Sequence, residues 1–257
     1  IETTYRFSKS MIDISSKFIL NNQNQTQKAL KHFNNDTINP IEIIQTDSFK
    51  NDDPYPLIFA LNKINEEYLK NKKKLRIIAL SRYNRVLDLY KKRTDLFTVK
   101  YNEIEENYTI KYLLLPHLEV QFLSVHRSKG LQGDYVIILN CISGQYGFPS
   151  EQADDPILNL LLSKSDQFEN GEERRLFYVA LTRSKQKTFI ITNPTYQSKF
   201  INEIVSKVFN DPQNNCPICK KGNKLKQEGI NKNGNRYIKY TCSNKYFGCD
   251  YLDWDNK

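Results

Sequence analysis

Four of the five cysteines lie in the last part of this 257-residue chain, at spacings that suit a metal ion. They are Cys216, Cys219, Cys242 and Cys249, which form a C-x2-C pair, a gap of 22 residues and a C-x6-C pair. Four thiolates in two pairs suit tetrahedral zinc, and soft sulfur ligands favour zinc over magnesium or calcium. A reduced or disulfide-bonded pair is the alternative. The fifth cysteine, Cys141, ends an apolar run, so we expect it to be a small buried side chain.

A second candidate for chemistry is Arg183, in the stretch GEERRLFYVALTRSK from Gly171 to Lys185. The apolar residues before it recur at helical spacing, which predicts a mostly buried helix. The simpler interpretation of Arg183 is a cation near a helix C-terminus, where the helix dipole favours positive charge. The other interpretation is an arginine held rigidly so that it reaches a phosphate. Taken alone, the stretch favours the first.

The end of the chain also combines basic and aromatic side chains. The whole chain has a net charge of +9 and a pI near 9.1, and the residues from Pro212 onward contribute nine basic and four acidic side chains, hence +5. This charge fits a polyanionic partner such as nucleic acid. The rings interleaved with these lysines are Tyr237, Tyr240, Tyr246, Phe247, Tyr251 and Trp254. They suit stacking on unpaired bases, and the alternative is that half of them form the core of a small module.

Several classes of function lack their motifs. There is no G-x-x-x-x-G-K-[ST] phosphate loop, no G-x-G-x-x-G after a strand and no credible Ser–His–Asp set, so hydrolysis of a nucleotide by this chain alone is not expected. There is no run of about 18 apolar residues and no signal peptide. We therefore expect a cytoplasmic protein without a membrane partner. The first residue is not Met, which suggests a fragment of a longer protein.

The elements that position these residues alternate along the chain. Strands are predicted at 41–46, 75–81, 118–126, 134–141 and 187–193, and helices at 8–20, 56–71, 82–93, 171–181 and 196–209. This alternation predicts an α/β fold, with a parallel sheet covered by helices on both faces. Ligands of such sheets bind at the carboxyl ends of the strands, where we place the turn at 127–130. Between the cysteine pairs, alternation around Asn233–Asn235 predicts a β-hairpin.

Three segments together resemble the UvrD/Rep-type superfamily 1 DNA helicases, and in particular the helicase IV subgroup. Residues 3–19 are similar to the family's Asn-Tyr-Arg-Ser motif, with Thr4 and Phe7 as departures from it. Residues 124–139 resemble the Thr-x-His-Ser-x-Lys-Gly-Leu-Glu motif, and residues 171–185 match the Glu-Glu-Arg-Arg-Leu-x-Tyr-Val-x-x-Thr-Arg-Ala motif at nearly every position. The resemblance implies that residues 1–209 form the second RecA-like domain of a helicase motor.

In that family the second domain closes over ATP and magnesium that are held mainly by a first RecA-like domain. The resemblance implies that Arg183 is the arginine finger and that Arg6 is a second contact to the γ-phosphate. Gly130 and Gln132 map to nucleotide-binding positions, although most of the family has Glu where Gln132 stands. The positions that map to single-stranded DNA contacts are Arg82, Asn84, Ser124, His126 and Lys129.

The remaining charged residues of the third motif receive a structural role. We expect Arg174 and Arg175 to form ion pairs with Glu172, Glu173 or neighbouring loops.

Residues 216–257 resemble the zinc ribbon at the C-terminus of bacterial type I topoisomerases, and residues 210–215 are expected to be a linker. A module this small buries little apolar surface, so the metal is expected to supply its folding energy. The resemblances imply the C-terminal portion of an ATP-dependent 3′→5′ DNA helicase that is inactive alone. The alternatives are a non-catalytic nucleic-acid-binding module with a helicase-like fold and a purely structural zinc-stabilised scaffold.

Overall fold

The computed structural model describes residues 3–4, 8–22, 25, 31–32, 40–46, 54–151, 168–208, 216–218, 224–230, 236–242 and 249–254. The helices are α1 (Lys9–Ile19), α2 (Tyr55–Asn71), η1 (Asn84–Val86), α3 (Leu87–Lys92), η2 (Val125–Ser128), α5 (Gly171–Leu181) and α6 (Lys199–Val208). The strands are β1 (Thr3–Thr4), β2 (Lys31–His32), β3 (Ile41–Gln45), β4 (Ile77–Ser81), β5 (Phe97–Asn102), β6 (Asn107–Tyr112), β7 (Glu119–Ser124), β8 (Gly133–Ile138), β9 (Ser184–Thr192), β10 (Lys224–Ile230), β11 (Arg236–Cys242) and β12 (Leu252–Trp254).

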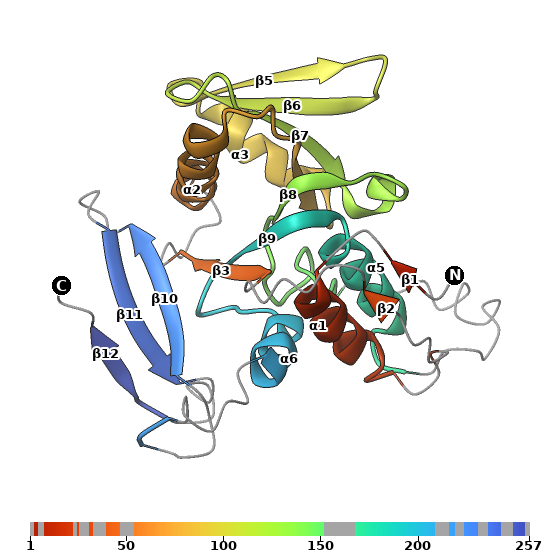
Figure 1. Ribbon diagram of the computed structural model, residues 1–257, viewed down its shortest axis with the longest axis vertical. Coiled ribbons are helices and arrows are strands. Elements are labelled where there is room, and N and C mark those ends of the chain that lie inside the picture. The colour runs from red at the N-terminus through yellow and green to blue at the C-terminus, as the bar shows by residue number, and fades with distance from the viewer. Residues whose placement is uncertain are drawn as a thin grey trace.

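One large sheet organises the molecule, in the order β12-β11-β10-β3-β9-β8-β4-β7-β6-β5 (Figure 1). Its five central strands, from β3 to β7 in that order, are parallel, as the alternation of strands and helices predicts. A separate parallel pair joins β1 and β2. The predicted α/β fold is confirmed.

Both faces of the central strands are buried under helices (Figure 1). On β4, Ile77 and Ala79 join an apolar cluster with residues of α2 and α3, whereas Ile78 and Leu80 join a second cluster with residues of α1, α5 and α6. This alternation follows from the two-residue period of a strand, which sends successive side chains to opposite faces. Parallel strands buried on both faces are continuously apolar for this reason, and β4 is buried throughout.

The sheet is not parallel throughout, which corrects the expectation of a parallel sheet at its edges. Strands β5 and β6 form an antiparallel hairpin beside β7, and this hairpin is not among the elements predicted from the sequence. Two further predicted elements are shorter. The helix expected at 82–93 is a turn of η1 followed by the six residues of α3, and the strand expected to reach His126 ends at Ser124, before η2.

A buried arginine ties three helices together, and its partner differs from the predicted one. Arg174 of α5 donates from both terminal nitrogens to Glu203 of α6, at 2.6 and 2.8 Å, and also to the backbone oxygen of Phe18 of α1. Its guanidinium lies over the rings of Phe18 and Phe200. The expected structural ion pair of Arg174 is therefore present, but its partner is Glu203 and not Glu172, Glu173 or a neighbouring loop. The charge is kept in the interior by a partner that satisfies both ends of its fork.

The cysteine-bearing segment packs beside the parallel sheet. Strands β10 and β11 pair along their whole length as the predicted hairpin, and β12 adds a third antiparallel strand. Strand β10 joins β3 through one residue pair, Glu228 with Ile44. The expected linker at 210–215 lies outside the described residues. Within the described parts of the chain, no helix has both the length and the apolar character needed to cross a membrane.

Candidate functional site

The residues assigned to DNA by resemblance lie mainly at the carboxyl ends of β4 and β7. These two strands are neighbours, and Ser81 and Ser124, their last residues, are partners in the register. Asn84 follows in η1 and His126 in η2, and both side chains are exposed. Lys129, which is also exposed, comes directly after η2. The parallel pairing thus brings polar side chains from separate segments to one edge of the sheet.

Arg82 lies at the same edge, but its side chain is already engaged. Its Nε donates to Oε1 of Glu173 on α5 at 2.8 Å, and both side chains are largely buried. The other carboxylate oxygen of Glu173 accepts from the backbone N–H of Ser150, and the Ser150 hydroxyl hydrogen-bonds that of Tyr83 at 2.7 Å. Glu173 therefore fastens the first turn of α5 to the segment after β4. Sequence reasoning did not find this pair, whose members lie 91 positions apart.

The loop that presents Ser150 contains a glycine that no other residue replaces without rearrangement. A Cβ atom on Gly147 would lie 2.0 Å from the backbone oxygen of Ile142. The close approach of these two backbone segments therefore requires glycine at position 147.

The residues assigned to the nucleotide gather at the other end of the strands. Arg183 follows α5 and directly precedes β9, and its backbone oxygen accepts from the N–H of Gly133 at the start of β8. Its side chain donates from Nε to the Val179 oxygen at 3.0 Å and from a terminal nitrogen to the Leu131 oxygen at 3.3 Å. Gln132, which is half-buried, comes directly after Leu131. Arg183 and Gln132 are thus brought together from segments about 50 residues apart.

Two local features fix the backbone around this group. Thr182 ends α5, and its hydroxyl donates to the backbone oxygen of Tyr178 at 2.9 Å, which closes the last turn. Gly130 has φ of 88°, a left-handed conformation in which side chains are strained, so the predicted tight turn needs glycine here. Burial raises the pKa of the nearby Tyr178 hydroxyl, and the positive charge of Arg183 opposes that shift.

The residues assigned to DNA and those assigned to the nucleotide do not share one end of the strands. The DNA-assigned residues Asn84 and His126 follow the carboxyl ends of strands, whereas Arg183 and Gln132 lie where β8 and β9 begin. The short segment 125–132 and helix α5 both run from one end to the other. Arg6 lies outside the described residues, so its expected position beside Arg183 stays a prediction.

Three cysteines meet in the β10–β12 segment. Cys216, Cys242 and Cys249 are buried, and their Sγ atoms all lie within 4.8 Å of one another. Cys216 Sγ is 3.6 Å from Cys249 Sγ, whereas two sulfurs on one tetrahedral zinc ion are separated by about 3.8 Å. The described thiols therefore fit a metal ion, and Cys219 lies outside the described residues. Cys141 is fully buried in the main core, as predicted, and burial raises the pKa of its thiol.

The sequence model of the UvrD-like helicase C-terminal domain matches residues 55–195, which is more than half of the chain. The chain belongs to this family. The matched UvrD-like region runs from α2 to the end of β9 and includes Asn84, His126 and Arg183. It therefore contains both ends of the strands described above.

Individual relatives of this UvrD-like domain are helicases by name. DNA helicase IV of Escherichia coli (strain K12) is 29% identical over 201 residues, which cover 78% of this chain and 25% of that protein. The Bacillus subtilis (strain 168) protein named "Putative ATP-dependent DNA helicase YjcD" is 38% identical over 73 residues, 28% of this chain and 8% of that protein. The chain thus spans about a quarter or less of these relatives.

A solved structure also aligns with the chain. It is the C-terminal domain of a possible DNA helicase from Lactobacillus plantarum WCFS1, with 12% identity and a TM-score of 0.42, and the alignment covers 80% of this chain and 96% of that one.

Proposed function

We propose that this chain is the C-terminal portion of an ATP-dependent 3′→5′ DNA helicase, made of a second RecA-like domain (residues 1–209), a linker (210–215) and a zinc ribbon (216–257). One observation carries the proposal. Helix α5 holds Arg183 at its end beside Gln132, and through Glu173 its first turn is bonded to Arg82, next to the DNA-assigned residues. A single rigid element therefore connects the two candidate sites.

Arg183 is the proposed arginine finger toward ATP and magnesium bound on a first RecA-like domain. In phosphoryl transfer, charge spreads over the γ-phosphate oxygens, and a positioned guanidinium stabilises it. The backbone oxygens of Val179 and Leu131 orient the Arg183 side chain in advance, which reduces the cost of ordering it at the moment of reaction. Arg6 is proposed as the second contact to the γ-phosphate, and Gly130 and Gln132 as contacts to the nucleotide.

The single strand is proposed to cross the carboxyl ends of β4 and β7. Asn84 and His126 are exposed there, and Ser124 and Lys129 add a hydroxyl and an ammonium group for backbone contacts. Because Arg82 is paired with Glu173, its proposed role is to transmit DNA contacts to α5 and so to Arg183. Closure of the two RecA-like domains around ATP would then move the strand-facing residues together with the finger.

The proposed zinc ion is held by Cys216, Cys219, Cys242 and Cys249. The mutual distances of the three described sulfurs fit this role, and the set of sulfur ligands favours zinc. A structural zinc ion is coordinated by four ligands, so it would link β11 to the segments that precede β10 and β12. The zinc ion supplies folding energy for this module, and strands β10–β12 form its surface.

Replacing Arg183 by alanine tests the proposed function in the full-length protein that carries the phosphate loop. We expect ATP hydrolysis stimulated by single-stranded DNA to fall by about a thousandfold or more in kcat, while ATP binding changes little. Arg183→Lys keeps a charge but loses the planar fork, so it should recover only part of the activity. Lys185→Ala, an exposed cation two residues away, is the matched control and should hydrolyse ATP normally.

Unchanged ATP hydrolysis in Arg183→Ala would refute the finger assignment. It would favour the alternative of a non-catalytic nucleic-acid-binding module with a helicase-like fold. Strand-displacement assays on 3′-tailed and 5′-tailed duplexes test the proposed direction in the same protein, and unwinding of the 5′-tailed substrate alone would contradict it.

A further inference from the structure

Strands β5 and β6, together with the first residues of β7 (Glu119 and Gln121), have a polar face that no described helix covers, whereas Leu123 at the far end of β7 is buried. Their apolar residues, such as Phe97, Ile110 and Val120, point to the other face and pack in the cluster with α2 and α3. The pairing register puts Lys100 opposite Thr109, and Thr109 opposite Gln121, on the open face. Lys100 is exposed and Thr109 and Gln121 are half-exposed. A sheet face made of such residues is suited to contact with water or with a polar ligand.

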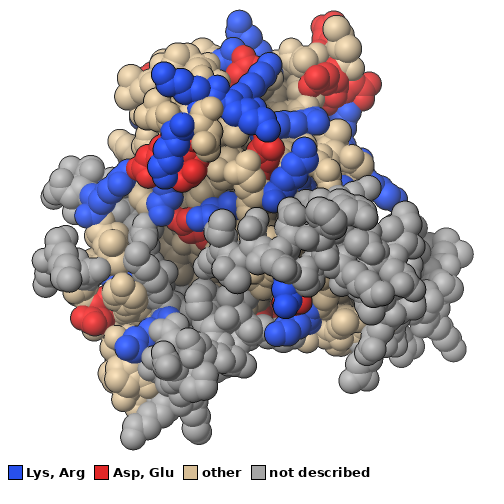
Figure 2. Space-filling model, in the orientation of Figure 1, with Lys and Arg blue, Asp and Glu red and all other residues tan. Residues whose placement is uncertain are grey.

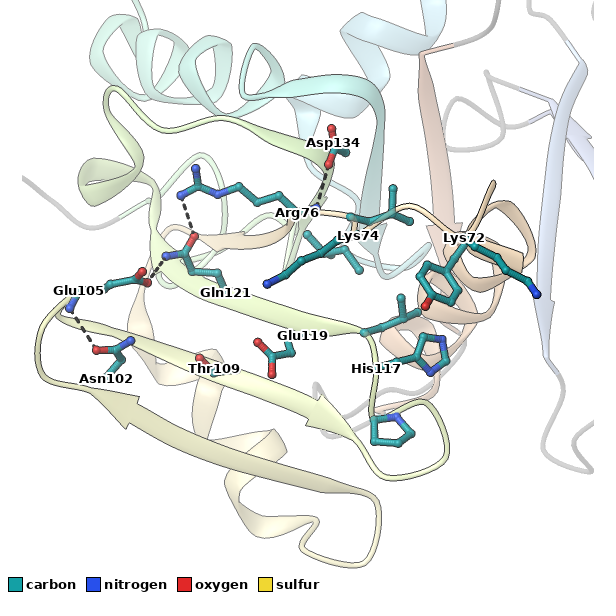
Figure 3. A pocket seen from close by; sticks show the side chains of 15 residues that line it. Lys72, Lys74, Arg76, Asn102, Glu105, Thr109, His117, Glu119, Gln121 and Asp134 are labelled. Carbon is teal, nitrogen blue, oxygen red and sulfur yellow. Dashed lines mark hydrogen bonds between the residues drawn. The ribbon is translucent and has the colours of Figure 1, made fainter. Parts of the chain in front are cut away.

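This face forms one wall of a broad cavity of about 910 Å³ (Figure 3). The segment between α2 and β4 borders it, and Figure 3 shows Lys74 and Arg76 extending over the strands. Lys72 ends α2 in a left-handed conformation, with φ of 47°, which directs the chain along the rim. Lys and Arg side chains gather over this upper part of the molecule in Figure 2. The cavity is thus built from a basic loop and a polar sheet face.

The positive charge at this cavity is concentrated in the loop on its border. The charged residues that line the cavity are balanced, with Lys72, Lys74 and Arg76 against Glu105, Glu119 and Asp134. The excess lies in the bordering segment 70–76, which has exposed Lys70, Lys72, Lys73, Lys74 and Arg76 and no acidic residue.

Each of the three carboxylates accepts a hydrogen bond, and Glu119 is the one paired with a cation. Glu119 forms an ion pair with Lys111 at 2.5 Å, which holds the pKa of Glu119 below its usual range. Asp134 accepts from the backbone N–H of Arg76, and Glu105 accepts from the side-chain amide of Gln121.

Among the cations of the loop, Arg76 has a neutral partner and Lys74 lies close enough to Glu119 to lower the pKa of that carboxyl. The guanidinium of Arg76 donates to the neutral amide oxygen of Gln121 at 3.2 Å, so its charge is not cancelled by that bond. Lys72 and Lys74 are exposed. A polyanion that enters the cavity therefore meets three cations from one five-residue loop. Phosphate groups spaced along a backbone match such a row of cations, and amide and hydroxyl groups of the sheet face add hydrogen bonds to phosphate and sugar oxygens.

The rings of the cavity do not favour unpaired bases. Tyr68 packs against His117, with centroids 4.7 Å apart, and His117 Nε2 hydrogen-bonds Oδ1 of Asn65. Single-strand sites stack bases on available aromatic faces, whereas a duplex hides its bases and presents phosphates. We propose that this cavity binds the sugar–phosphate backbone of duplex DNA, with Lys72, Lys74 and Arg76 neutralising its phosphates. This site uses residues other than those of the proposed function.

Neutralising the loop tests this inference on the 257-residue chain. The triple variant Lys72→Asn, Lys74→Gln and Arg76→Gln removes three charges, and Asn is tolerated at the left-handed position 72. Binding of a labelled blunt duplex is measured by fluorescence anisotropy between about 50 and 200 mM salt. The slope of the logarithm of the binding constant against the logarithm of the salt concentration should become shallower by about two to three, because each phosphate contact contributes about 0.9. Binding of a single-stranded oligonucleotide should stay within about twofold.

Two further variants sharpen the test. The matched control removes the same number of charges at exposed positions of α1 and α3, by Lys9→Gln, Lys91→Gln and Lys92→Gln. Its salt slope for duplex binding should stay within about one unit of that of the parent chain. Glu119→Gln frees Lys111 and removes a carboxylate that repels phosphate. It should therefore tighten duplex binding, whereas the loop variant weakens it. Thr109→Glu places a new negative charge on the sheet face and should weaken binding without touching the loop.

Equal losses in the loop variant and the matched control would overturn the inference, because binding would then follow net charge alone. Loss of single-strand binding in parallel with duplex binding would also overturn it. A third contradicting result would come from competition: if an acidic polypeptide displaced the bound duplex and other polyanions did not, the cavity would be assigned to a protein partner. Normal thermal unfolding of each variant establishes that folding is intact. Activity of Arg183→Ala bears only on the proposed function, so the two outcomes remain separable.

Discussion

Residues 8–208 and residues 216–254 bury very different kinds of side chain. The first region places its parallel strands between two apolar clusters, in which the rings of Phe18, Phe177 and Phe200 pack with centroids 5.2 to 5.4 Å apart. In the second region, the described buried cluster consists of Cys216, Cys242 and Cys249, with Tyr251 packed against it.

The difference reflects size. A long chain buries enough apolar surface to offset the entropy of ordering it, whereas a module of about 40 residues does not and needs a metal or disulfide. In the described parts of the chain, the sheet pairing between the two regions is a single residue pair, Glu228 of β10 with Ile44 of β3. We therefore expect them to respond independently to changes that remove their respective sources of stability.

Loss of the proposed zinc ion should give the largest effect, and it should be confined to the second region. Structural zinc contributes an apparent free energy of about 10 kcal/mol or more in small modules, so a chelator or Cys242→Ser should unfold β10–β12. The emission of Trp254, the only tryptophan, reports that region, and far-ultraviolet circular dichroism reports the sheet. Cys141→Ala is the control, since Cys141 lies in the main core and should leave zinc content unchanged. Full retention of zinc by Cys242→Ser would refute the assigned ligand.

A cavity in the main core should destabilise only the first region. Phe177→Ala deletes a fully buried ring between Phe18, Phe148 and Phe200, and should lower the free energy of unfolding by about 3–5 kcal/mol. Urea unfolding followed by circular dichroism measures this loss, and Phe177→Leu should lose less. If the Trp254 transition moved by the same amount, the two regions would be one cooperative unit and the comparison would fail.

The aromatic surface of the second region should contribute to single-strand binding. Trp254 is 49% exposed, its ring lies 5.8 Å from that of Tyr237, and Lys239 lies over both rings. Trp254→Ala should weaken binding of a single-stranded oligonucleotide by about 1–3 kcal/mol, and Trp254→Phe by less. Quenching of the Trp254 emission on binding provides a direct readout. Leu252→Ala, at an equally exposed neighbour, is the control. Unchanged emission at saturation would show that this ring packs the module only.

The exposed ion pair between the two regions should have the smallest effect when it is removed. Arg236 of β11 approaches Glu66 of α2 at 3.3 Å, and both side chains are more than half exposed. Exposed ion pairs contribute about 0–1 kcal/mol, so Arg236→Ala should leave both unfolding transitions nearly unchanged. A shift of either transition by several kcal/mol would show that the regions support each other more than the described contacts indicate.

Much of the chain's local structure follows from its sequence. Helix α1 starts where predicted because the Ser8 side chain accepts from the Met11 N–H, and helix α2 ends before Lys72, within one residue of the prediction. The strands of the parallel sheet are recognisable as apolar runs, because burial on both faces requires apolar residues throughout. The hairpin β5–β6 was not predicted although its signal is present, because FTVKYN and NYTIKY both alternate apolar and polar residues as half-buried strands do.

For the candidate site too, some features follow from the sequence and others only from the tertiary structure. Cysteine spacing and the motif around Arg183 identify residue types, since both depend on short stretches of chain. The sequence could not place Arg183 at the starting ends of β8 and β9 or assign Glu203 to Arg174, and it could not pair Glu173 with Arg82. These contacts join positions 29 to 91 residues apart, and they depend on which strands and helices become neighbours. Only the packing of the whole sheet decides that, because a side chain's partner is set by position in space and not by its distance along the chain.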